Sequence, residues 1–243
     1  YLSLEIAPDS LKSFFEDIDQ YNLRGFNITI PHKVNALNYV DEIDQSAKTI
    51  GAINCITINN NKSLLVANYD AKGFMDSLIS NYSENIFNKK PVIVIGAGGA
   101  SRAILYSLIN YGIKEIRLSN RTYEKSKILK KYFGNVIKII PWDEKENSLN
   151  DCGLFINTTS QGMIGKDPLD MDISGLPREA IVIDLIYNPI DTDLIKRASL
   201  RGNKTLNGLP MLVYQAVPAW EAWFGIKPDV TKELLDLLEK ALQ

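Results

Sequence analysis

The segment PVIVIGAGGASRAILYSLINYG, residues 91–112, constrains the fold more than any other part of the chain. A run of β-branched apolar residues ends at Gly96, and a helical pattern begins within a few residues of Gly98. Glycines permit a tight turn and close approach of the backbone to a ligand, and the following helix N-terminus presents unpaired N–H groups and partial positive charge. We therefore predict that the loop binds a dinucleotide pyrophosphate. The residues assigned to it are Gly96, Ala97, Gly98, Gly99 and Ala100.

A plain strand-to-helix turn is the alternative interpretation of this loop. The dinucleotide pattern expects a small residue, usually glycine, at its third place, and Ser101 stands there. Glycine turns join many strands to helices, so the loop alone is a weak signal. The strand pattern KEIRLSNR that follows the helix completes a strand–loop–helix–strand unit, which favours the dinucleotide site.

The end of this second strand indicates which dinucleotide is bound. NAD enzymes usually place an Asp or Glu about 20 residues after the loop, where it binds the ribose 2′-hydroxyl. Here Arg121 stands at that point, and a guanidinium binds a phosphate where a carboxylate would repel it. A solvated helix start is the alternative, but cations near a helix N-terminus are unfavourable without an anion. We predict NADP as cofactor, with its ribose phosphate bound by Asn120, Arg121, Thr122 and Lys125.

Strand and helix patterns alternate along the chain, which predicts an α/β fold. Leu11, Phe14, Phe15 and Ile18 follow helical spacing, and GFNITI, residues 25–30, reads as a strand. The polar residues 80–90 read as a boundary between two domains. We expect an N-terminal mixed α/β domain over 1–85, a Rossmann-type NADP-binding domain over 86–208, and C-terminal helices over 209–243 that pack back on the first domain.

Composition excludes several classes of function. The 27 basic and 29 acidic residues give a net charge of −2 without a basic stripe, so neither nucleic acid nor a membrane is an expected partner. No apolar run reaches the ~18 residues that a membrane span needs. Cys55, Cys152 and one histidine match no metal spacing, which predicts no metal and a reducing cytoplasm. The sequence begins with Tyr1 instead of Met, which leaves open whether another segment precedes it.

A nicotinamide cofactor implies hydride transfer at a carbon bearing oxygen, and a proton must be given to or taken from that oxygen. Lys33 and Asp70 both follow strand patterns, so they are the candidate pair. Singly, Lys33 reads as a surface lysine and Asp70 as a turn or cap residue, and spacing does not decide between these readings. His32 reads as structural.

Eight motifs occur in order along nearly the whole chain: GFNITIPHK, GAIN, NYDAKGF, IGAGGASRA, SNRT, NTTSQGM, DLIYNP and GLPMLVYQA. Together they resemble the shikimate dehydrogenase family, NADP-dependent enzymes that reduce 3-dehydroshikimate to shikimate on the route to chorismate and aromatic amino acids. The resemblance implies that Lys33 and Asp70 are catalytic and that the first domain binds the substrate. It also implies substrate contacts from Thr29, Asn54, Tyr187 and Gln215, and a nicotinamide end lined by Leu185 and Gly208.

Three features depart from the family pattern. Tyr69 and Cys55 stand where the family has threonines beside the reacting groups. The family's leading strand and its Ser-x-Ser loop, which binds the substrate carboxylate, have no counterpart before Tyr1. Either the sequence given omits them or the protein lacks them. In the second case we expect weak substrate binding with intact NADPH binding.

Two rival functions stay open. A relative that also uses quinate, with NAD as cofactor, is one, and Arg121 argues against NAD. A non-catalytic sensor of NADP(H) is the other, and the presence of Lys33 and Asp70 argues against it. We expect a small-molecule substrate, and the sequence leaves monomer and homodimer open.

Overall fold

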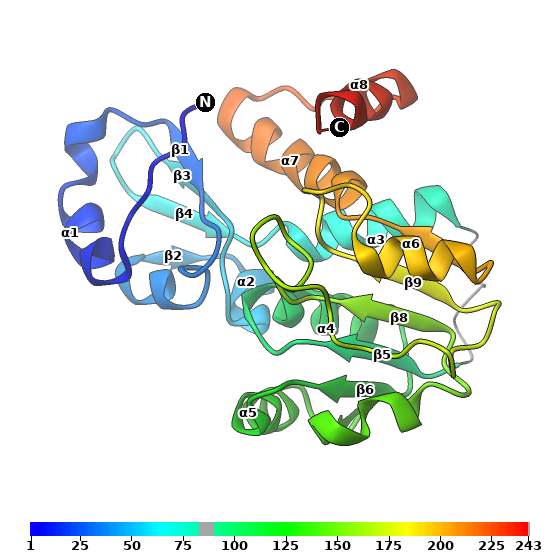
Figure 1. Ribbon diagram of the computed structural model, residues 1–243. Helices are drawn as coiled ribbons and strands as arrows, with labels where there is room; N and C mark the ends of the chain where they lie inside the picture. Colours follow the sequence, from blue (N-terminus) through cyan, green and yellow to red (C-terminus); the bar gives the residue numbers. More distant parts are fainter. Residues whose placement is uncertain (83–89, 243) are drawn as a thin grey trace. The chain divides into compact units, whose positions relative to one another are not determined.

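The computed structural model describes residues 1–82 and 90–242 (Figure 1). The chain divides into two compact units. The first unit comprises Tyr1–Tyr69 and Val217–Pro228, and the second comprises Asp70–Ala216 and Asp229–Gln243.

The first unit contains a four-stranded mixed sheet with the strand order β1-β3-β4-β2. Strand β3 is antiparallel to β1 and β4, whereas β2 runs parallel to β4. The elements of Tyr1–Tyr69 are η1 (Pro8–Ser10), α1 (Leu11–Glu16), η2 (Ile18–Tyr21), β1 (Gly25–Asn27), η3 (Asn35–Tyr39), β2 (Glu42–Ile43), α2 (Gln45–Ile50), β3 (Cys55–Ile58) and β4 (Leu64–Ala67).

The apolar face predicted for the first helix is confirmed for Leu11, Phe14 and Phe15, which are buried in the core of this unit. Ile18 lies beyond the end of α1, in η2, and is half-buried against the same core. Two predicted elements differ in extent. The strand expected over residues 25–30 ends at Asn27, because the backbone then turns and the His32 N–H donates to the Thr29 carbonyl at 2.9 Å.

The polar stretch read as helical from residue 41 begins its helix only at Gln45. The Asp44 carboxylate accepts from the N–H groups of Ser46 and Ala47 at 2.8 and 3.2 Å, which makes it the N-cap. The two residues before it, Glu42–Ile43, form β2 instead.

The second unit contains a six-stranded parallel sheet with the order β10-β9-β8-β5-β6-β7. This is the predicted Rossmann-type arrangement, in which each strand is followed by a crossover. Its strands are β5 (Val92–Ile95), β6 (Ile116–Ser119), β7 (Ile137–Ile140), β8 (Leu154–Asn157), β9 (Ile181–Asp184) and β10 (Lys204–Leu206). Its helices are α3 (Asp70–Asn81), α4 (Gly99–Asn110), α5 (Tyr123–Phe133), η4 (Trp142–Ser148), α6 (Asp193–Leu200), the first part of α7 (Leu209–Phe224) and α8 (Lys232–Leu242).

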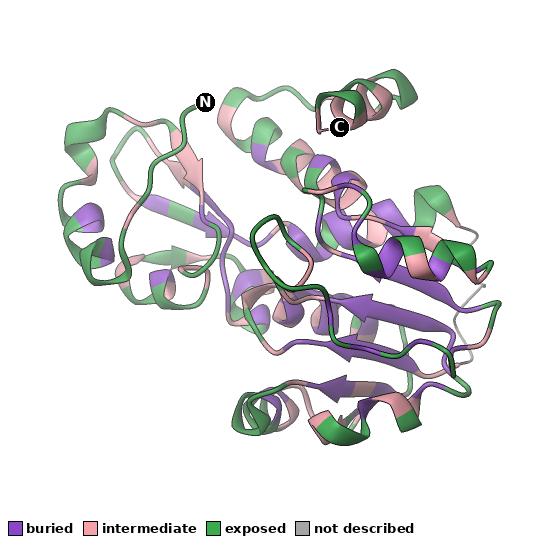
Figure 2. Cartoon of the chain, viewed as in Figure 1, coloured by how far each residue is buried: buried purple, intermediate pink, exposed green. Residues whose placement is uncertain are grey.

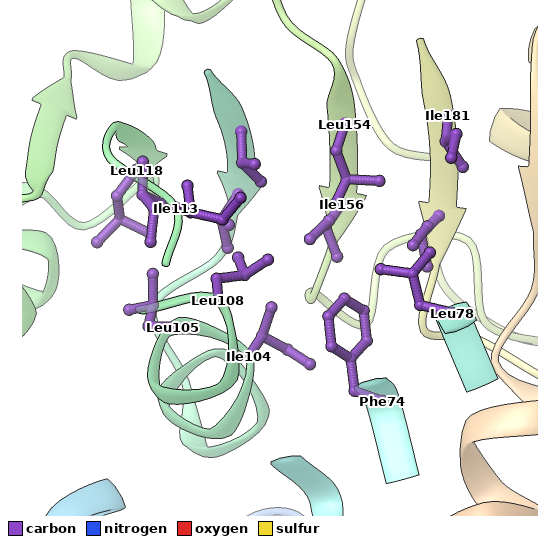
Figure 3. Close-up of a cluster of buried hydrophobic side chains, with 14 of the residues drawn as sticks. Phe74, Leu78, Ile104, Leu105, Leu108, Ile113, Leu118, Leu154, Ile156 and Ile181 are labelled. Atoms are coloured by element: carbon purple, nitrogen blue, oxygen red, sulfur yellow. The ribbon is translucent and has the colours of Figure 1, made fainter. Parts of the chain in front are cut away.

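Both faces of this sheet are covered, and the strands β5, β8 and β9 are buried at every position (Figure 2). Side chains alternate between the faces. On one face, Val94 and Ile156 pack with residues of α3, α4 and α5, as the close-up of Phe74 and Ile104 illustrates (Figure 3). On the other, Ile93 and its neighbours pack against α6 and the segment that precedes β9. Because both faces of the sheet are covered, a ligand can bind only at the ends of the strands and in the loops there.

The compact units do not follow the expected domain boundaries. The boundary expected at 85/86 lies within residues 83–89, outside the described residues. Helix α3 belongs to the second unit, because Phe74 and Leu78 are part of its core. The C-terminal helices divide as well. Trp223, near the end of α7, donates its indole N–H to the Ile56 carbonyl at 3.0 Å within the first unit. Helix α8 instead packs on Leu209 and Val213 of the second unit through Leu234, Leu235, Leu238 and Leu242.

Candidate active site

The carboxyl ends of the parallel strands gather the residues predicted to bind the cofactor. The register places the last residues of four strands in one row: Ser119, Ile95, Asn157 and Asp184. The loops that leave this row carry the glycine loop, Arg121 and Leu185. Open α/β sheets bind their ligands at the carboxyl ends of the strands. The structure therefore brings the predicted cofactor residues of the second unit to one end of the sheet.

The glycine loop has the conformation that its sequence requires. Gly96 has a φ of +110°, and a Cβ there would lie 2.5 Å from the Thr158 hydroxyl. Gly98 faces open space, with nothing within 4 Å of a Cβ built on it. Helix α4 begins at Gly99 without a side-chain cap, and its orphan N–H groups suit an anion. The Ser101 hydroxyl is buried and donates to the Gly98 carbonyl at 2.7 Å, which accounts for its place in the pattern.

The end of β6 supplies the group predicted to bind the ribose phosphate. The Asn120 side chain holds the backbone on both sides, accepting from the Ala97 N–H at 3.1 Å and donating to the Thr122 carbonyl at 2.8 Å. Asn120 therefore fixes the glycine loop to the loop that follows β6. Arg121, Thr122 and Lys125 are exposed where α5 begins.

Leu185 and Gly208, predicted at the nicotinamide end, meet through their backbones. A Cβ on Gly208 would lie 2.0 Å from the Leu185 carbonyl oxygen, so only glycine fits there. The Gly208 N–H also donates to the Ile186 carbonyl at 2.9 Å. Helix α7 begins directly after this contact, at Leu209. The loop after β9 and the start of α7 are therefore fixed to each other.

Two predicted substrate residues lie on helices that cross closely. Asp70 is buried and begins α3, while Gln215 is on α7. A Cβ on Gly73 would lie 2.6 Å from the Gln215 Cβ and 2.7 Å from its backbone nitrogen. The absence of a side chain at Gly73 thus sets the separation of the two helices that carry Asp70 and Gln215. Tyr187 lies in the loop after β9 with an exposed side chain.

The first unit gathers Thr29, Lys33 and Asn54 around the start of β3. Asn54 is buried, and its carbonyl accepts from the Ile28 N–H at 2.9 Å, directly before Thr29. Its side-chain oxygen accepts from the Tyr69 N–H at 2.8 Å. The Lys33 carbonyl accepts from the Ile53 N–H at 2.8 Å, which ties the lysine loop to the same place.

The two departures from the family pattern lie close to this cluster. Cys55 follows Asn54, and burial raises the pKa of its thiol to about 12. Burial also raises the pKa of Tyr69, whose backbone binds Asn54. Cys55 is thus taken up in the interior of the first unit, whereas Tyr69 is half-buried. Lys33 belongs to the first unit and Asp70 to the second, so their pairing stays a prediction.

Sequence reasoning missed a buried polar cluster at the carboxyl ends of β8 and β9. Asp184 and Asn157 end adjacent strands, are fully buried, and share a hydrogen bond of 3.0 Å. Each is a polar residue at the end of an apolar strand, and that pattern was the signal available in the sequence. Burial raises the pKa of Asp184 to about 6, although three donors face its carboxylate.

The described residues contain neither a membrane-spanning helix nor a metal-binding cluster. Over residues 1–82 and 90–242, every helix is too short or too polar to cross a membrane. The same part of the chain contains no group of three or more His, Cys, Asp or Glu residues placed to hold a metal ion.

Three family descriptions match successive parts of the chain. Residues 1–56 match "Shikimate dehydrogenase substrate binding domain", residues 79–195 match "Shikimate / quinate 5-dehydrogenase", and residues 208–232 match "Shikimate 5'-dehydrogenase C-terminal domain". A shikimate dehydrogenase (NADP(+)) from Paramagnetospirillum magneticum is 40% identical over 234 residues, which cover 96% of this chain and 85% of the relative.

Solved structures of similar proteins agree in fold. Shikimate dehydrogenase from Aquifex aeolicus superposes with a TM-score of 0.84 at 34% identity, covering 98% of this chain and 85% of that one. The Thermus thermophilus shikimate 5-dehydrogenase, in complex with NADP(H) and shikimate, gives 0.80 at 29% identity, with coverage of 100% and 86%. A quinate dehydrogenase from Corynebacterium glutamicum, in complex with NAD, gives 0.84 at 25% identity, with coverage of 98% and 84%.

Proposed function

Because the chain belongs to the shikimate dehydrogenase family, we propose that it catalyses the reversible, NADPH-dependent reduction of 3-dehydroshikimate to shikimate. The observation that carries this proposal is the set of groups at the carboxyl end of the six-stranded sheet. There a glycine loop and an uncapped helix N-terminus stand beside an exposed arginine and lysine, Arg121 and Lys125. The step belongs to chorismate and aromatic amino-acid biosynthesis.

The second unit fits the cofactor. Gly98 leaves open space beside the N-terminus of α4, which suits the pyrophosphate. Arg121, with Thr122 and Lys125, provides the positive charge that a 2′-phosphate needs. Leu185 and Gly208 would border the nicotinamide, while Asn120 holds the loops in place.

The reaction adds a hydride and a proton across a ketone. NADPH, when bound, supplies the hydride to the C3 carbon. Lys33 donates the proton to the ketone oxygen, and in the reverse direction it takes the proton from the hydroxyl. Asp70 keeps the ammonium charged and oriented, because a carboxylate beside an ammonium favours its protonated form.

Neutral hydrogen-bonding groups complete the proposed substrate site. Thr29 and Asn54 of the first unit, with Tyr187 and Gln215 of the second, would bind the ring hydroxyls and the carboxylate. A polyhydroxy acid calls for several such groups around one charged pair. A substrate that lacked a hydroxyl would leave some of them unpaired and would be rejected.

Absorbance at the NADPH band, with shikimate and NADP⁺ as substrates, tests the activity. We expect turnover by the wild type and a loss of kcat in Lys33→Ala and Asp70→Asn. A double-mutant cycle then asks whether the two residues act together, since groups that act as a unit give strongly non-additive losses. Additive losses would refute the proposed pair.

Arg121→Ala tests the cofactor assignment. A hydrogen bond to a charged group contributes about 1.5–3 kcal/mol, so the KM for NADPH should rise roughly 10- to 150-fold. The KM for NADH should hardly change, because NADH lacks the 2′-phosphate. Equal changes would refute the assignment. Faster oxidation of quinate with NAD⁺ would favour the quinate rival, and NADP⁺ binding without turnover would favour the sensor.

We place the enzyme in the cytoplasm, which the two free, buried cysteines support. Its partners in this proposal are the small-molecule substrate and the cofactor, without nucleic acid or membrane. Sedimentation would decide between monomer and homodimer.

A further inference from the structure

Asp184 is a fully buried carboxylate that the proposed reaction does not use. It ends β9 and accepts three hydrogen bonds, from the Asn157 amide at 3.0 Å, the Ile186 N–H at 3.2 Å and the Thr192 hydroxyl at 2.7 Å. A buried carboxylate is costly even when it is hydrogen-bonded, and an apolar residue of similar size is often more stable at such a place. Its donors come from two places, the end of β8 and the loop after β9, so the carboxylate connects them.

The Asn157 side chain extends the contact to the glycine loop. Its oxygen accepts from both the N–H and the hydroxyl of Thr159, at 3.0 and 2.8 Å. Its amide also donates to the Gln161 carbonyl at 3.2 Å, so the whole turn after β8 is held. Thr158 and Thr159 are the residues that contact Gly96. The Asp184–Asn157 pair thus fixes the turn that supports the glycine loop.

The other two donors fix the loop after β9. Ile186 donates its N–H to Asp184 and accepts from the Gly208 N–H at 2.9 Å, so Asp184 also determines where Gly208 meets Leu185. Thr192 is the N-cap of α6, accepting from the Ile195 N–H at 3.3 Å, and it closes the same loop at its far end.

We propose that Asp184 and Asn157 are positioning residues for the nicotinamide end of the cofactor. They act by joining the turn after β8, the loop after β9 and the start of α7 through one buried hydrogen-bonded pair. This inference rests on the proposed function, because it assumes that NADP(H) binds along the carboxyl ends of the strands. A group that fixes reacting geometry matters strongly, since a displacement of about 1 Å can lower a rate roughly 100-fold.

The test compares two ligands that share one half. NADP⁺ reaches the nicotinamide end, whereas 2′,5′-ADP contains only the adenosine half and its 2′-phosphate. In Asp184→Ala the dissociation constant for NADP⁺ should rise about tenfold or more, and that for 2′,5′-ADP should stay within about twofold. Asp184→Asn should recover much of the loss, because its amide oxygen still accepts from Asn157 and Ile186. If Asp184→Ala does not fold, Thr192→Val removes one donor and Thr192→Ser retains it.

Asn203 provides a matched control at the opposite end of the same sheet. It is buried, and its amide donates to the carbonyls of Pro177, Arg178 and Ala180, just before β9 begins. Asn203→Ala should therefore destabilise the fold but leave the ratio of the two dissociation constants unchanged.

The outcomes separate this inference from the proposed function. An unchanged ratio in folded Asp184→Ala and Thr192→Val, or an equal change in Asn203→Ala, would overturn the positioning role while the proposed function stands. If the wild type binds neither ligand, both fail. If it binds both but does not oxidise shikimate, the proposed activity fails and the ratio still decides the positioning role.

Discussion

Gly73 offers the sharpest test of how the second unit arranges its substrate residues. It lies in the first turns of α3, where it faces α7. The Cβ of Gly73→Ala would lie 2.6 Å from the Gln215 Cβ, 2.7 Å from its nitrogen and 2.9 Å from its Cα. Carbon atoms in contact normally lie about 3.5–4.0 Å apart. Two of the three atoms belong to the α7 backbone, so rotation of a side chain cannot relieve the clash.

The expected magnitude is a difference of two opposing terms. Glycine in a helix interior is less favourable than alanine by about 1 kcal/mol, so helix propensity alone would make Gly73→Ala more stable. Overpacking in a closed core costs about 1–3 kcal/mol. We expect the free energy of unfolding to fall by roughly 0–2 kcal/mol, the difference of these two ranges. The helices must also separate by about an ångström to restore normal contact.

The functional effect should exceed the effect on stability. Because Asp70 and Gln215 lie on the two helices, their separation should change, and kcat/KM for shikimate should fall roughly 10- to 100-fold. The dissociation constant of 2′,5′-ADP, the adenosine half of the cofactor, should change by less than about twofold, since Gly96 and Arg121 lie on other elements. Lys72→Ala is the control, because Lys72 is the exposed neighbour in the same helix. Urea unfolding and steady-state kinetics measure the two effects. A variant more stable than the wild type, with unchanged kcat/KM, would refute the argument.

Three further predictions concern single sites. Gly208→Ala would place a Cβ 2.0 Å from the Leu185 carbonyl oxygen. The free energy of unfolding should therefore fall by about 1–3 kcal/mol, and NADP⁺ should bind more weakly. An unchanged midpoint of urea unfolding would contradict this prediction. Burial raises the pKa of Asp184 from 3.8 to about 6, so the folded protein keeps a proton that the unfolded chain loses. The free energy of unfolding of the wild type should therefore fall relative to that of Asp184→Asn as pH rises from about 4 to about 6, by at most roughly 3 kcal/mol. If the difference between the two free energies does not vary with pH, the raised pKa is excluded. Cys55 and Cys152 are buried with thiol pKa values of about 12, so a thiol reagent should label them only after unfolding; rapid labelling of the folded chain would disprove their burial.

Local sequence patterns predicted the second unit well. The apolar run before Gly96 forms β5, and the glycine loop and α4 follow where the pattern placed them. Leu234, Leu235, Leu238 and Leu242 recur on one side of a helical pattern and form the packed face of α8. These features are local: strand and helix periodicity, glycine at a positive φ, and the chemistry of a helix N-terminus all depend on neighbouring residues.

Packing partners could not be predicted in the same way. The leucines of α8 specify an apolar face but do not specify which surface receives it, and they pack on Leu209 and Val213 instead of the first unit. Strand β1 ends at Asn27 although Ile28 to Ile30 continue the alternating pattern, because the backbone turns between Thr29 and His32. Helix α3 carried no recognised helical signal, yet Phe74 and Leu78 are central to the second core.

The sequence by itself determined the α/β class, the glycine loop after a buried strand, the place of Arg121 after the next strand and the order of the family's motifs. Each of these is written in adjacent residues or in a fixed short spacing. Only the tertiary structure decided that Gly73 lies against Gln215 and that Asp184, Asn157 and Thr192 share one buried cluster. These contacts join residues far apart in the chain, and what fixes them is the close packing of backbones and the need of a buried carboxylate for donors, neither of which a local pattern contains.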